Sequence, residues 1–401
     1  MSEILSGAAT VSYDTTPVAP LGIIAMPGCE ELGEKIDRYL RTWRKETIED
    51  NADFVTYTGY GMDSFLLNVK IPRFGTGEGK GLVAQSARGY DVYIITDVTA
   101  RQVTYKMYGQ TVPYSPDDHY ADLKRIIAAI GGKAYRISVI MPFLYESRQH
   151  RKVSRESMDC ALMLQELSHM GVSNIITFDA HDPRVQNAIP LTGFENVMPT
   201  YQVLKALLRK HRDMKLDKEH MMIISPDEGA MDRNIYYSTV LGLDLGMFYK
   251  RRDYSKVVDG RNQIIAHEYL GDSVKGKDVL VVDDIISSGE SMLDLLKDLR
   301  RRKVNRVFMA ATFCFFTNGT KAFEEAYKKG YLGGVIGTNL NYKPDEIRNA
   351  PWFIEADMSK YMSFIIATLN HDHSLDKLMN PLARINNLLS KYRANNGCEI
   401  K

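Results

Sequence analysis

The chain has little of what would mark several common classes of protein. Its 401 residues include only four cysteines and two tryptophans, and 51 basic residues almost balance 50 acidic ones, leaving a net charge of +1. Cys29, Cys160, Cys314 and Cys398 lack the close spacing of a metal or redox motif, so we expect reduced thiols. The charge balance gives no reason to invoke nucleic acid or an acidic membrane surface.

Long hydrophobic runs are also missing. No apolar segment approaches the roughly 20 residues that a membrane-spanning helix needs, and no charged-then-apolar leader opens the chain. We therefore expect a cytoplasmic protein with no membrane partner.

The composition that is present predicts a large globular protein. Apolar residues make up 44% of the chain and charged residues 25%, and the length favours two domains. Strand and helix patterns alternate in both halves, which predicts two α/β domains, each a mainly parallel sheet flanked by helices. We expect a flexible arm at residues 1–20, domains at 21–197 and 198–370, and a helical tail at 371–401.

The stretch from Val279 to Met292 carries the strongest functional signal. Val279 to Val282 is typical of a strand buried on both faces, and it ends in two adjacent carboxylates, Asp283 and Asp284. Small residues follow, and then a helical pattern begins. Free N–H groups at a helix start bind phosphate, while the carboxylates would accept hydrogen bonds from a polyol. Phosphate beside polyol indicates a sugar phosphate.

The loop between that strand and its helix also permits a simpler interpretation. Ser287 and Glu290 have the S-x-x-E spacing of a capping box, which would make them a helix cap. A cap explains the serine and the glutamate but not the two aspartates at the end of an apolar strand. We therefore favour the sugar-phosphate site.

Two further strand ends carry polar side chains. Asp227 and Gly229 lie between a strand and a helix, so the same argument predicts a second anion pocket there. His181 follows another strand. A lone histidine is more often structural, but one flanked by aspartates at a strand end is a reasonable ligand for magnesium-bound ATP.

Three adjacent cations, Lys250, Arg251 and Arg252, follow a further strand. Such a cluster is usually a solvated surface. Here a long polar loop, residues 253–272, comes directly after it, and this arrangement fits better with a mobile lid over a charged transition state.

Two loops in the first half are ambiguous from their residues alone. In residues 73–82, RFGTGEGKGL, every second residue from Gly75 to Gly81 is a glycine. The segment lacks the lysine-serine/threonine ending of a P-loop, and no helix pattern follows it. A flexible turn is therefore the simpler interpretation. Residues 142–157 contain five basic side chains, which are equally compatible with a solvated loop and with a clamp for phosphates.

Taken in order, these six segments resemble the ribose-phosphate diphosphokinase family, whose two domains have the type I phosphoribosyltransferase fold. The resemblance covers about residues 30–370. It implies that the first domain binds ATP: Phe74 and Glu78 would contact adenine, Arg148 and Gln149 the phosphates, and His181 the metal-bound nucleotide.

The same resemblance implies that the second domain binds ribose 5-phosphate. Asp227 and Gly229 would contact the diphosphoryl group, and Asp227 would share metal binding with His181. Lys250 and Arg252 would be the catalytic cations. The ribose 5-phosphate contacts would be Asp283, Asp284, Ser287, Ser288, Gly289 and Ser291.

The resemblance implies a reaction that transfers the diphosphoryl group of magnesium ATP to the 1-hydroxyl of ribose 5-phosphate, for nucleotide biosynthesis. It also implies a homo-oligomer, either a dimer or a hexamer.

Four residues depart from the family pattern: Thr76, His150, Ser287 and Glu290. The Glu290 carboxylate would either repel the phosphate or turn back as a helix cap. Two other functions stay open, a phosphoribosyltransferase that consumes phosphoribosyl diphosphate and a regulatory homologue without turnover.

Overall fold

The structure is a computed structural model that describes residues 15–152, 154–258 and 261–394, with side chains described outside residues 250–267. It divides into two compact units. Unit 1 comprises the chain up to Pro199 with Leu340–Tyr342 and Asp357–Pro381. Unit 2 comprises Thr200–Asn339, Lys343–Ala356 and the chain from Leu382.

Unit 1 is built on a five-stranded parallel sheet with the order β1-β4-β7-β8-β9. Parallel sheets are covered on both faces, which explains why the three central strands are rich in isoleucine and valine. The strands are β1 (Leu21–Ala25), β4 (Asp91–Ile95), β7 (Arg136–Ile140), β8 (Asn174–Phe178) and β9 (Gly193–Val197).

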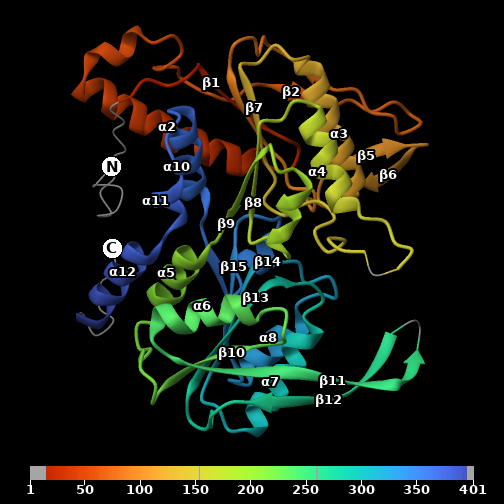
Figure 1. Ribbon diagram of the computed structural model, residues 1–401, viewed down its shortest axis with the longest axis vertical. Helices are drawn as coiled ribbons and strands as arrows, with labels where there is room; N and C mark the ends of the chain where they lie inside the picture. Colours follow the sequence, from red (N-terminus) through yellow and green to blue (C-terminus); the bar gives the residue numbers. More distant parts are fainter. Residues whose placement is uncertain (1–14, 153, 259–260, 395–401) are drawn as a thin grey trace. The chain divides into compact units, whose positions relative to one another are not determined.

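Helices cover this sheet on both sides. Figure 1 shows α2 and α10 on one side and α3 and α4 on the other. The helices are α2 (Glu30–Asp50), α3 (Pro116–Ile130), α4 (Asp159–His169), α10 (Ser359–Asn370) and α11 (Asp376–Met379), with 3-10 turns at Ala52–Thr56 and Pro183–Ala188. Two small hairpins pair β2 (Val69–Lys70) with β3 (Leu82–Val83), and β5 (Thr104–Met107) with β6 (Gln110–Pro113).

Unit 2 holds a seven-stranded sheet with the order β12-β11-β10-β13-β14-β15-β16, in which only the β11–β12 pair is antiparallel. The strands are β10 (Met221–Ser225), β11 (Asp244–Val258), β12 (Arg261–Leu270), β13 (Asp278–Ile286), β14 (Val307–Cys314), β15 (Leu332–Thr338) and β16 (Phe353–Ala356). The helices are α5 (Thr200–Lys210), α6 (Met231–Leu241), α7 (Glu290–Arg301), α8 (Lys321–Lys328), α9 (Asp345–Arg348) and α12 (Leu382–Ala394).

Alternate residues of β13 supply two hydrophobic cores, because successive side chains of a strand point to opposite faces. Val279 and Val281 pack with residues of α7 and α8. Leu280 and Val282 pack with residues of α5, α6 and α12. The expected class, α/β units with mainly parallel sheets flanked by helices, is confirmed. In the part of the chain that the structure describes, no helix is both long and apolar enough to cross a membrane.

The division of the chain differs from the contiguous domains expected at 21–197 and 198–370. Helix α10 belongs to unit 1 because it packs on α2: Phe364 stacks on Trp43 with ring centroids 4.5 Å apart. The expected tail at 371–401 is also shared, since α11 lies in unit 1 and α12 packs on unit 2. Most of the expected arm, residues 1–14, lies outside the described residues.

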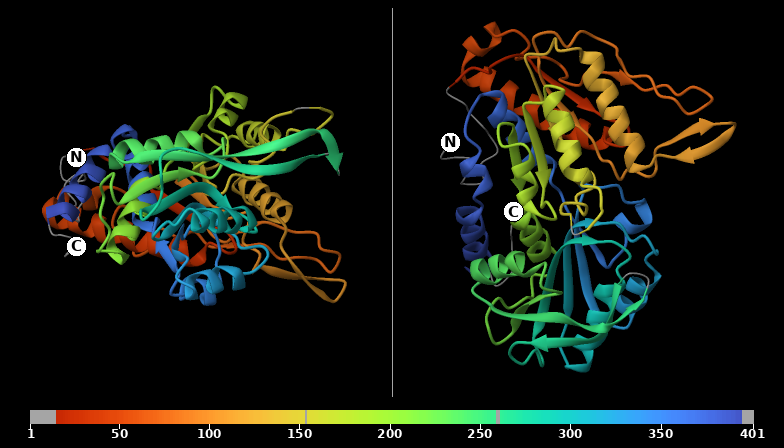
Figure 2. Two further views of the ribbon diagram at one scale, coloured as in Figure 1. Left: turned by 90° about the horizontal axis from the view of Figure 1, so that it is seen from below. Right: turned by 45° about the vertical axis from the view of Figure 1, so that its right-hand side comes forward.

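Residues 54–71 form a 3-10 turn and irregular chain before β2, and residues 105–119 contain most of the β5–β6 hairpin and the start of α3. One local expectation was wrong. The polar lid loop expected at 253–272 is mostly the β11–β12 ladder, in which Val258 pairs with Arg261. The two long strands of this ladder can be followed in Figure 2. The sequence contains a hairpin signal in this region, the dipeptide Asp259-Gly260.

A buried polar network anchors α10 to the sheet of unit 1. Asn370, which is fully buried, accepts a hydrogen bond from Arg44 at 2.6 Å and donates to Asp91 at 3.0 Å and to the Ala19 carbonyl at 3.1 Å. Arg136 forms two hydrogen bonds with Asp91, both 2.8 Å long. The Asp91 carboxylate therefore pairs with Arg136, and the Arg44 guanidinium is hydrogen-bonded to Asn370, which limits the penalty for burying these charges.

We predict that Asn370→Ala destabilises unit 1 by about 3 kcal/mol, because it leaves buried donors and acceptors without partners. Chemical denaturation monitored by tryptophan fluorescence measures the change. Asn187→Ala removes an exposed amide from the same unit and is the control. Equal stability of the two variants would contradict the role assigned to the network.

Candidate active site

The junction between β13 and α7 places the two predicted carboxylates inside the strand. The strand extends past them to Ile286, further than its apolar run predicts, because Asp283 and Ile285 continue the parallel pairing with β14. Helix α7 then begins at Glu290. The loop from Ser287 to Gly289 therefore connects a central strand to a helix N-terminus.

Gly289 is required at the end of this loop for two reasons. Its φ of +85° lies in the left-handed region, which side chains rarely adopt. A Cβ atom at this position would also lie 2.4 Å from the Phe323 ring of α8. The glycine therefore allows the loop to turn tightly against α8 and leaves the first N–H groups of α7 accessible to an anion.

The capping-box interpretation of this loop is wrong. Gly289, rather than Ser287, is the N-cap of α7, and no side chain caps the helix. Glu290 instead accepts a hydrogen bond from Asn318 at 2.9 Å. Within the described residues, no hydrogen bond uses the hydroxyls of Ser287 or Ser291, so both are available to a ligand.

Burial and neighbouring negative charges both disfavour the ionised form of the carboxyl of Asp283. Asp284 is buried, with 6% of its surface exposed, and its N–H donates to Asp283 Oδ1 at 2.9 Å. Burial raises the pKa of the Asp283 carboxyl well above its usual range, and the nearby charges of Asp284 and Asp227 raise it further. Arg233, whose Nη1 lies 3.8 Å from Asp283 Oδ1, acts in the opposite direction.

Two residues of α6 support this site, and the sequence analysis missed both. Arg233 is the ion-pair partner of Asp283. Asn234 is fully buried and donates through its amide to the carbonyls of Val282, at 2.8 Å, and Ala230, at 2.7 Å. It thereby connects β13 to the loop after β10. A usable signal existed, since Asn234 occupies the inward-facing position of a helix where an apolar residue is expected.

The predicted diphosphate loop follows β10, which is the direct neighbour of β13. Asp227 Oδ1 accepts a hydrogen bond from the Ala230 N–H at 3.2 Å, and Ser225 donates to the Asp227 carbonyl at 2.8 Å. Gly229 lies between them with little around it, since an added Cβ would meet only Asp227, at 3.4 Å. Parallel pairing thus brings Asp227 to the same sheet edge as Asp283 and Asp284.

Lys250 and Arg252 lie in β11, where they pair with His267 and Ile264 of β12. The ladder is irregular between Arg251 and Arg252. The side chains of both predicted catalytic cations lie outside the described part of the structure. Their role stays a prediction.

In unit 1, the loops after β7 and β8 meet because the two strands are neighbours. The His150 and His181 rings lie edge to face, 5.3 Å apart, and His150 also lies 3.5 Å from Asp182. Gln149 is held in place by donating to the Ser157 carbonyl at 2.9 Å, whereas Arg148 is exposed. The structure therefore brings the predicted phosphate segment together with the predicted metal-nucleotide histidine.

The Phe74–Glu78 segment forms the turn at the tip of the β2–β3 hairpin. Phe74 N–H donates to the Glu78 carbonyl at 2.8 Å, and Thr76, one of the departures from the family pattern, donates to the Glu78 carboxylate at 2.7 Å. Arg73 ties this tip to α3 through Asp122 at 2.7 Å. The Phe74 ring remains 60% exposed and is available for stacking.

Comparison with known proteins gives a consistent picture. Residues 21–171 match the model of the N-terminal domain of ribose phosphate pyrophosphokinase, and residues 193–342 match the phosphoribosyl transferase domain. The ribose-phosphate pyrophosphokinase of Vibrio cholerae is 26% identical over 77% of this chain and 90% of its own length. That of Wolinella succinogenes is 25% identical over 82% and 95%, respectively.

A solved structure shares the fold. Phosphoribosylpyrophosphate synthetase from Mycobacterium smegmatis superposes with a TM-score of 0.67 and 20% identity, covering 87% of this chain and 98% of that one. The fold is thus that of a transferase with two phosphoribosyltransferase-type domains. The chain belongs to the ribose-phosphate pyrophosphokinase family.

The raised pKa of Asp283 predicts that the stability of the folded protein depends on pH. The folded protein holds the Asp283 proton above pH 3.8, the ordinary pKa, whereas the unfolded chain releases it there. The free energy of unfolding therefore falls as the pH rises from 3.8 towards the pKa of the folded state. Asp283→Asn cannot ionise. We expect this variant to melt at a higher temperature than the wild type at pH 7 and at a similar temperature near pH 4.

Thermal denaturation across this pH range is the measurement. Asp345→Asn, which changes an exposed carboxylate of the same unit, is the control and is expected to show no such crossover. A Tm difference for Asp283→Asn that is the same at both pH values would contradict the assignment.

Proposed function

We propose that this protein is a ribose-phosphate diphosphokinase, which transfers the β,γ-diphosphoryl group of magnesium ATP to the 1-hydroxyl of ribose 5-phosphate. The products are AMP and phosphoribosyl diphosphate, a precursor for nucleotide biosynthesis. The relatives that match most of the chain are named ribose-phosphate pyrophosphokinase, which supports the reaction. The observation that carries the proposal is the β13–α7 junction of unit 2.

At this junction each part of ribose 5-phosphate has a chemical counterpart. Asp283 and Asp284 accept hydrogen bonds from the ribose hydroxyls. The 5-phosphate lies at the start of α7, where it meets backbone N–H groups and the hydroxyls of Ser287, Ser288 and Ser291. Because Gly289 has no side chain, the backbone approaches the phosphate closely.

The ATP contacts come from the first half of the chain, residues 21–197. Phe74 stacks on adenine, with Glu78 as a hydrogen-bonding contact, and Arg148 and Gln149 bind the phosphates. Exposure of the Phe74 ring and of Arg148 supports these roles. The second half, residues 198–370, supplies the ribose 5-phosphate site and the Asp227–Gly229 loop for the diphosphoryl group.

Magnesium fits the chemistry of the proposed ligands. No group of three acidic, histidine or cysteine side chains in the described residues forms a metal site by itself. Magnesium usually takes one or two carboxylates and completes its shell with water and substrate phosphates, so Asp227 with ATP oxygens suffices, and His181 provides a second contact. When bound, the ion neutralises charge on the ATP phosphates.

The protein's own contribution is placement and charge. Lys250 and Arg252 offset the negative charge that accumulates on the transferring group, and Arg233 keeps Asp283 oriented towards the ribose. A homo-oligomer, dimer or hexamer, is the assembly that the family resemblance favours. The match of residues 21–171 to the N-terminal domain of a pyrophosphokinase disfavours a phosphoribosyltransferase, which has no need of an ATP domain.

The test of this function is AMP formation from ATP, ribose 5-phosphate and magnesium. We expect ribose-dependent AMP from the wild type and a loss of about 100-fold in kcat for Lys250→Ala, the usual effect of removing one preorganised charge. Lys215→Ala removes an exposed lysine of unit 2 and is expected to retain full activity.

Two results would contradict the proposal. One is the absence of AMP from folded protein that binds ATP, which would favour a regulatory homologue. The other is consumption of phosphoribosyl diphosphate with a purine or pyrimidine base and no need of ATP, which would identify a phosphoribosyltransferase.

The carboxylate of Glu290 is expected to weaken binding of the 5-phosphate. It lies in the first turn of α7, close to the proposed phosphate position, and Asn318 holds it there. Glu290→Gln keeps an acceptor for Asn318 and removes the charge. We predict that KM for ribose 5-phosphate falls roughly two- to fivefold while kcat stays unchanged.

Steady-state kinetics at low and high salt measure this effect, which added salt should reduce. Asp294→Asn removes an exposed charge one turn further along α7 and is the control. An unchanged or higher KM in Glu290→Gln would show that the carboxylate does not oppose the phosphate.

A further inference from the structure

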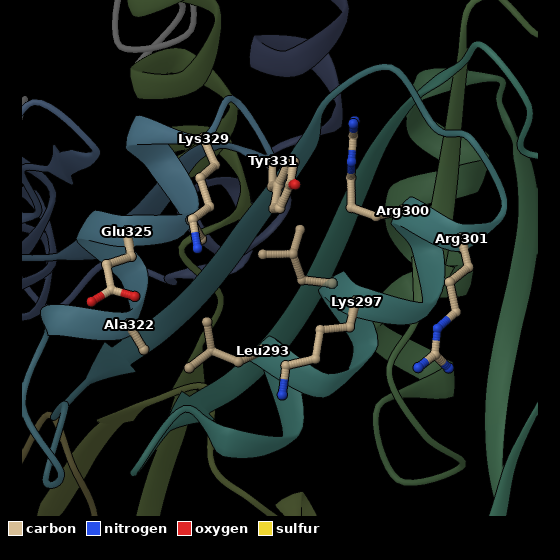
Figure 3. A pocket seen from close by; sticks show the side chains of 10 residues that line it. Leu293, Lys297, Arg300, Arg301, Ala322, Glu325, Lys329 and Tyr331 are labelled. Carbon is tan, nitrogen blue, oxygen red and sulfur yellow. The ribbon is translucent and has the colours of Figure 1, made fainter.

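A cavity lies in unit 2, and none of the proposed ATP or ribose 5-phosphate contacts lines it. It has a volume of about 680 Å³ and lies between α7 and α8 (Figure 3). Ligand pockets typically enclose about 300–1,000 Å³, so this cavity has room for a small organic molecule. Its lining comprises Leu293, Leu296, Lys297, Arg300, Arg301, Ala322, Glu325, Ala326, Lys329 and Tyr331.

The floor of the cavity is apolar. Leu296 and Ala326 are buried members of the core between the sheet and these helices, and Leu293 packs against the same core. Tyr331 closes one end, and 40% of its surface is exposed. An apolar group bound here would cover the parts of Leu293, Ala322 and Tyr331 that are exposed to water.

The rim of the cavity is cationic. Lys297, Arg300 and Arg301 come from α7 and Lys329 from the end of α8, against a single carboxylate, Glu325. Figure 3 shows the three α7 side chains on one side of the cavity and Lys329 across from them.

These cations differ in what they already bind. Arg300 is fixed, because it lies 4.7 Å from the centre of the Tyr331 ring and donates to the Val304 carbonyl at 3.2 Å. Lys297 pairs with Asp294 at 2.9 Å in an exposed contact, which contributes little. Within the described part of the chain, the side chains of Arg301 and Lys329 have no hydrogen-bonding or ionic partner, so their charges are available to a ligand.

A simpler explanation accounts for part of this arrangement. Basic residues are common in the last turn of a helix, where they complement the helix dipole, and Arg300 and Arg301 are in the last turn of α7. That explanation does not account for the apolar hollow beside them, nor for the exposed ring of Tyr331.

We propose that this cavity binds an amphipathic anion: a small molecule with an apolar aliphatic or aromatic body and one carboxylate, sulfonate or phosphate group. The body packs on Leu293 and Ala322 above the buried floor, and the anionic group lies at the cationic rim next to Lys329. The site does not depend on the proposed reaction, since none of its lining residues belongs to the proposed ATP or ribose 5-phosphate contacts.

The aromatic sulfonate 8-anilinonaphthalene-1-sulfonate is a suitable probe, because its fluorescence rises on binding. We expect one saturable site on the full-length wild-type chain. Lys329→Glu should weaken its Kd about fivefold or more, the effect of exchanging a favourable rim charge for an unfavourable one. Ala322→Trp, at an exposed position of the lining, should abolish binding by filling the cavity.

The matched control is Lys328→Glu, which makes the same charge change at the adjacent exposed residue outside the lining. We expect a Kd within about twofold of the wild type. Equal weakening by Lys328→Glu and Lys329→Glu, or binding that survives Ala322→Trp, would overturn the proposal.

Displacement of the probe by other small molecules tests whether the anionic group is required in addition to the apolar body. Octanoate should displace the probe, and 1-octanol, whose uncharged molecule has an apolar chain at least as long, should require a concentration at least about tenfold higher. Equal displacement by the two would overturn the requirement for an anion. Circular dichroism of each variant confirms that a loss of binding does not reflect unfolding.

Discussion

The proposed active site depends on keeping two adjacent carboxylates, Asp283 and Asp284, near the carboxyl end of the central strand of a mainly parallel sheet. Burial and mutual repulsion oppose this arrangement, as the raised pKa of Asp283 shows. The neighbouring strand adds a third carboxylate, Asp227, at the same edge. Such a concentration of negative charge is costly in an empty protein and useful in one that binds hydroxyl groups and a divalent cation.

The surrounding structure limits that cost through two residues of one helix. Arg233 lies close enough to Asp283 to offset part of its charge, and Asn234 joins the backbone of β13 to the loop that carries Asp227. Gly289 completes the arrangement on the other side, where only a glycine lets the loop pass beneath Phe323. The site is therefore built by α6, α7 and α8 together, although its polar groups come mainly from the strand ends.

A different constraint governs unit 1. Its last helix, α10, arrives from the far end of the chain and is tied to the sheet by the buried network of Asn370, Arg44 and Asp91. This packing explains why the two units are not contiguous in sequence. In the same unit His150, one of the four departures from the family pattern, packs against His181 and lies beside Asp182.

The α/β class, the family and the strand ends that carry polar groups were predictable from the sequence, because strand burial and the strand–loop–helix pattern are local properties. Contacts between distant segments set the features that local patterns cannot specify. The S-x-x-E spacing at Ser287 suggested a cap, but contact with Phe323 selects a left-handed Gly289 as the helix start and leaves Glu290 to Asn318. Arg233, Asn234 and the assignment of α10 to unit 1 likewise emerge only when segments distant in sequence pack together, since their partners lie on other elements of the fold.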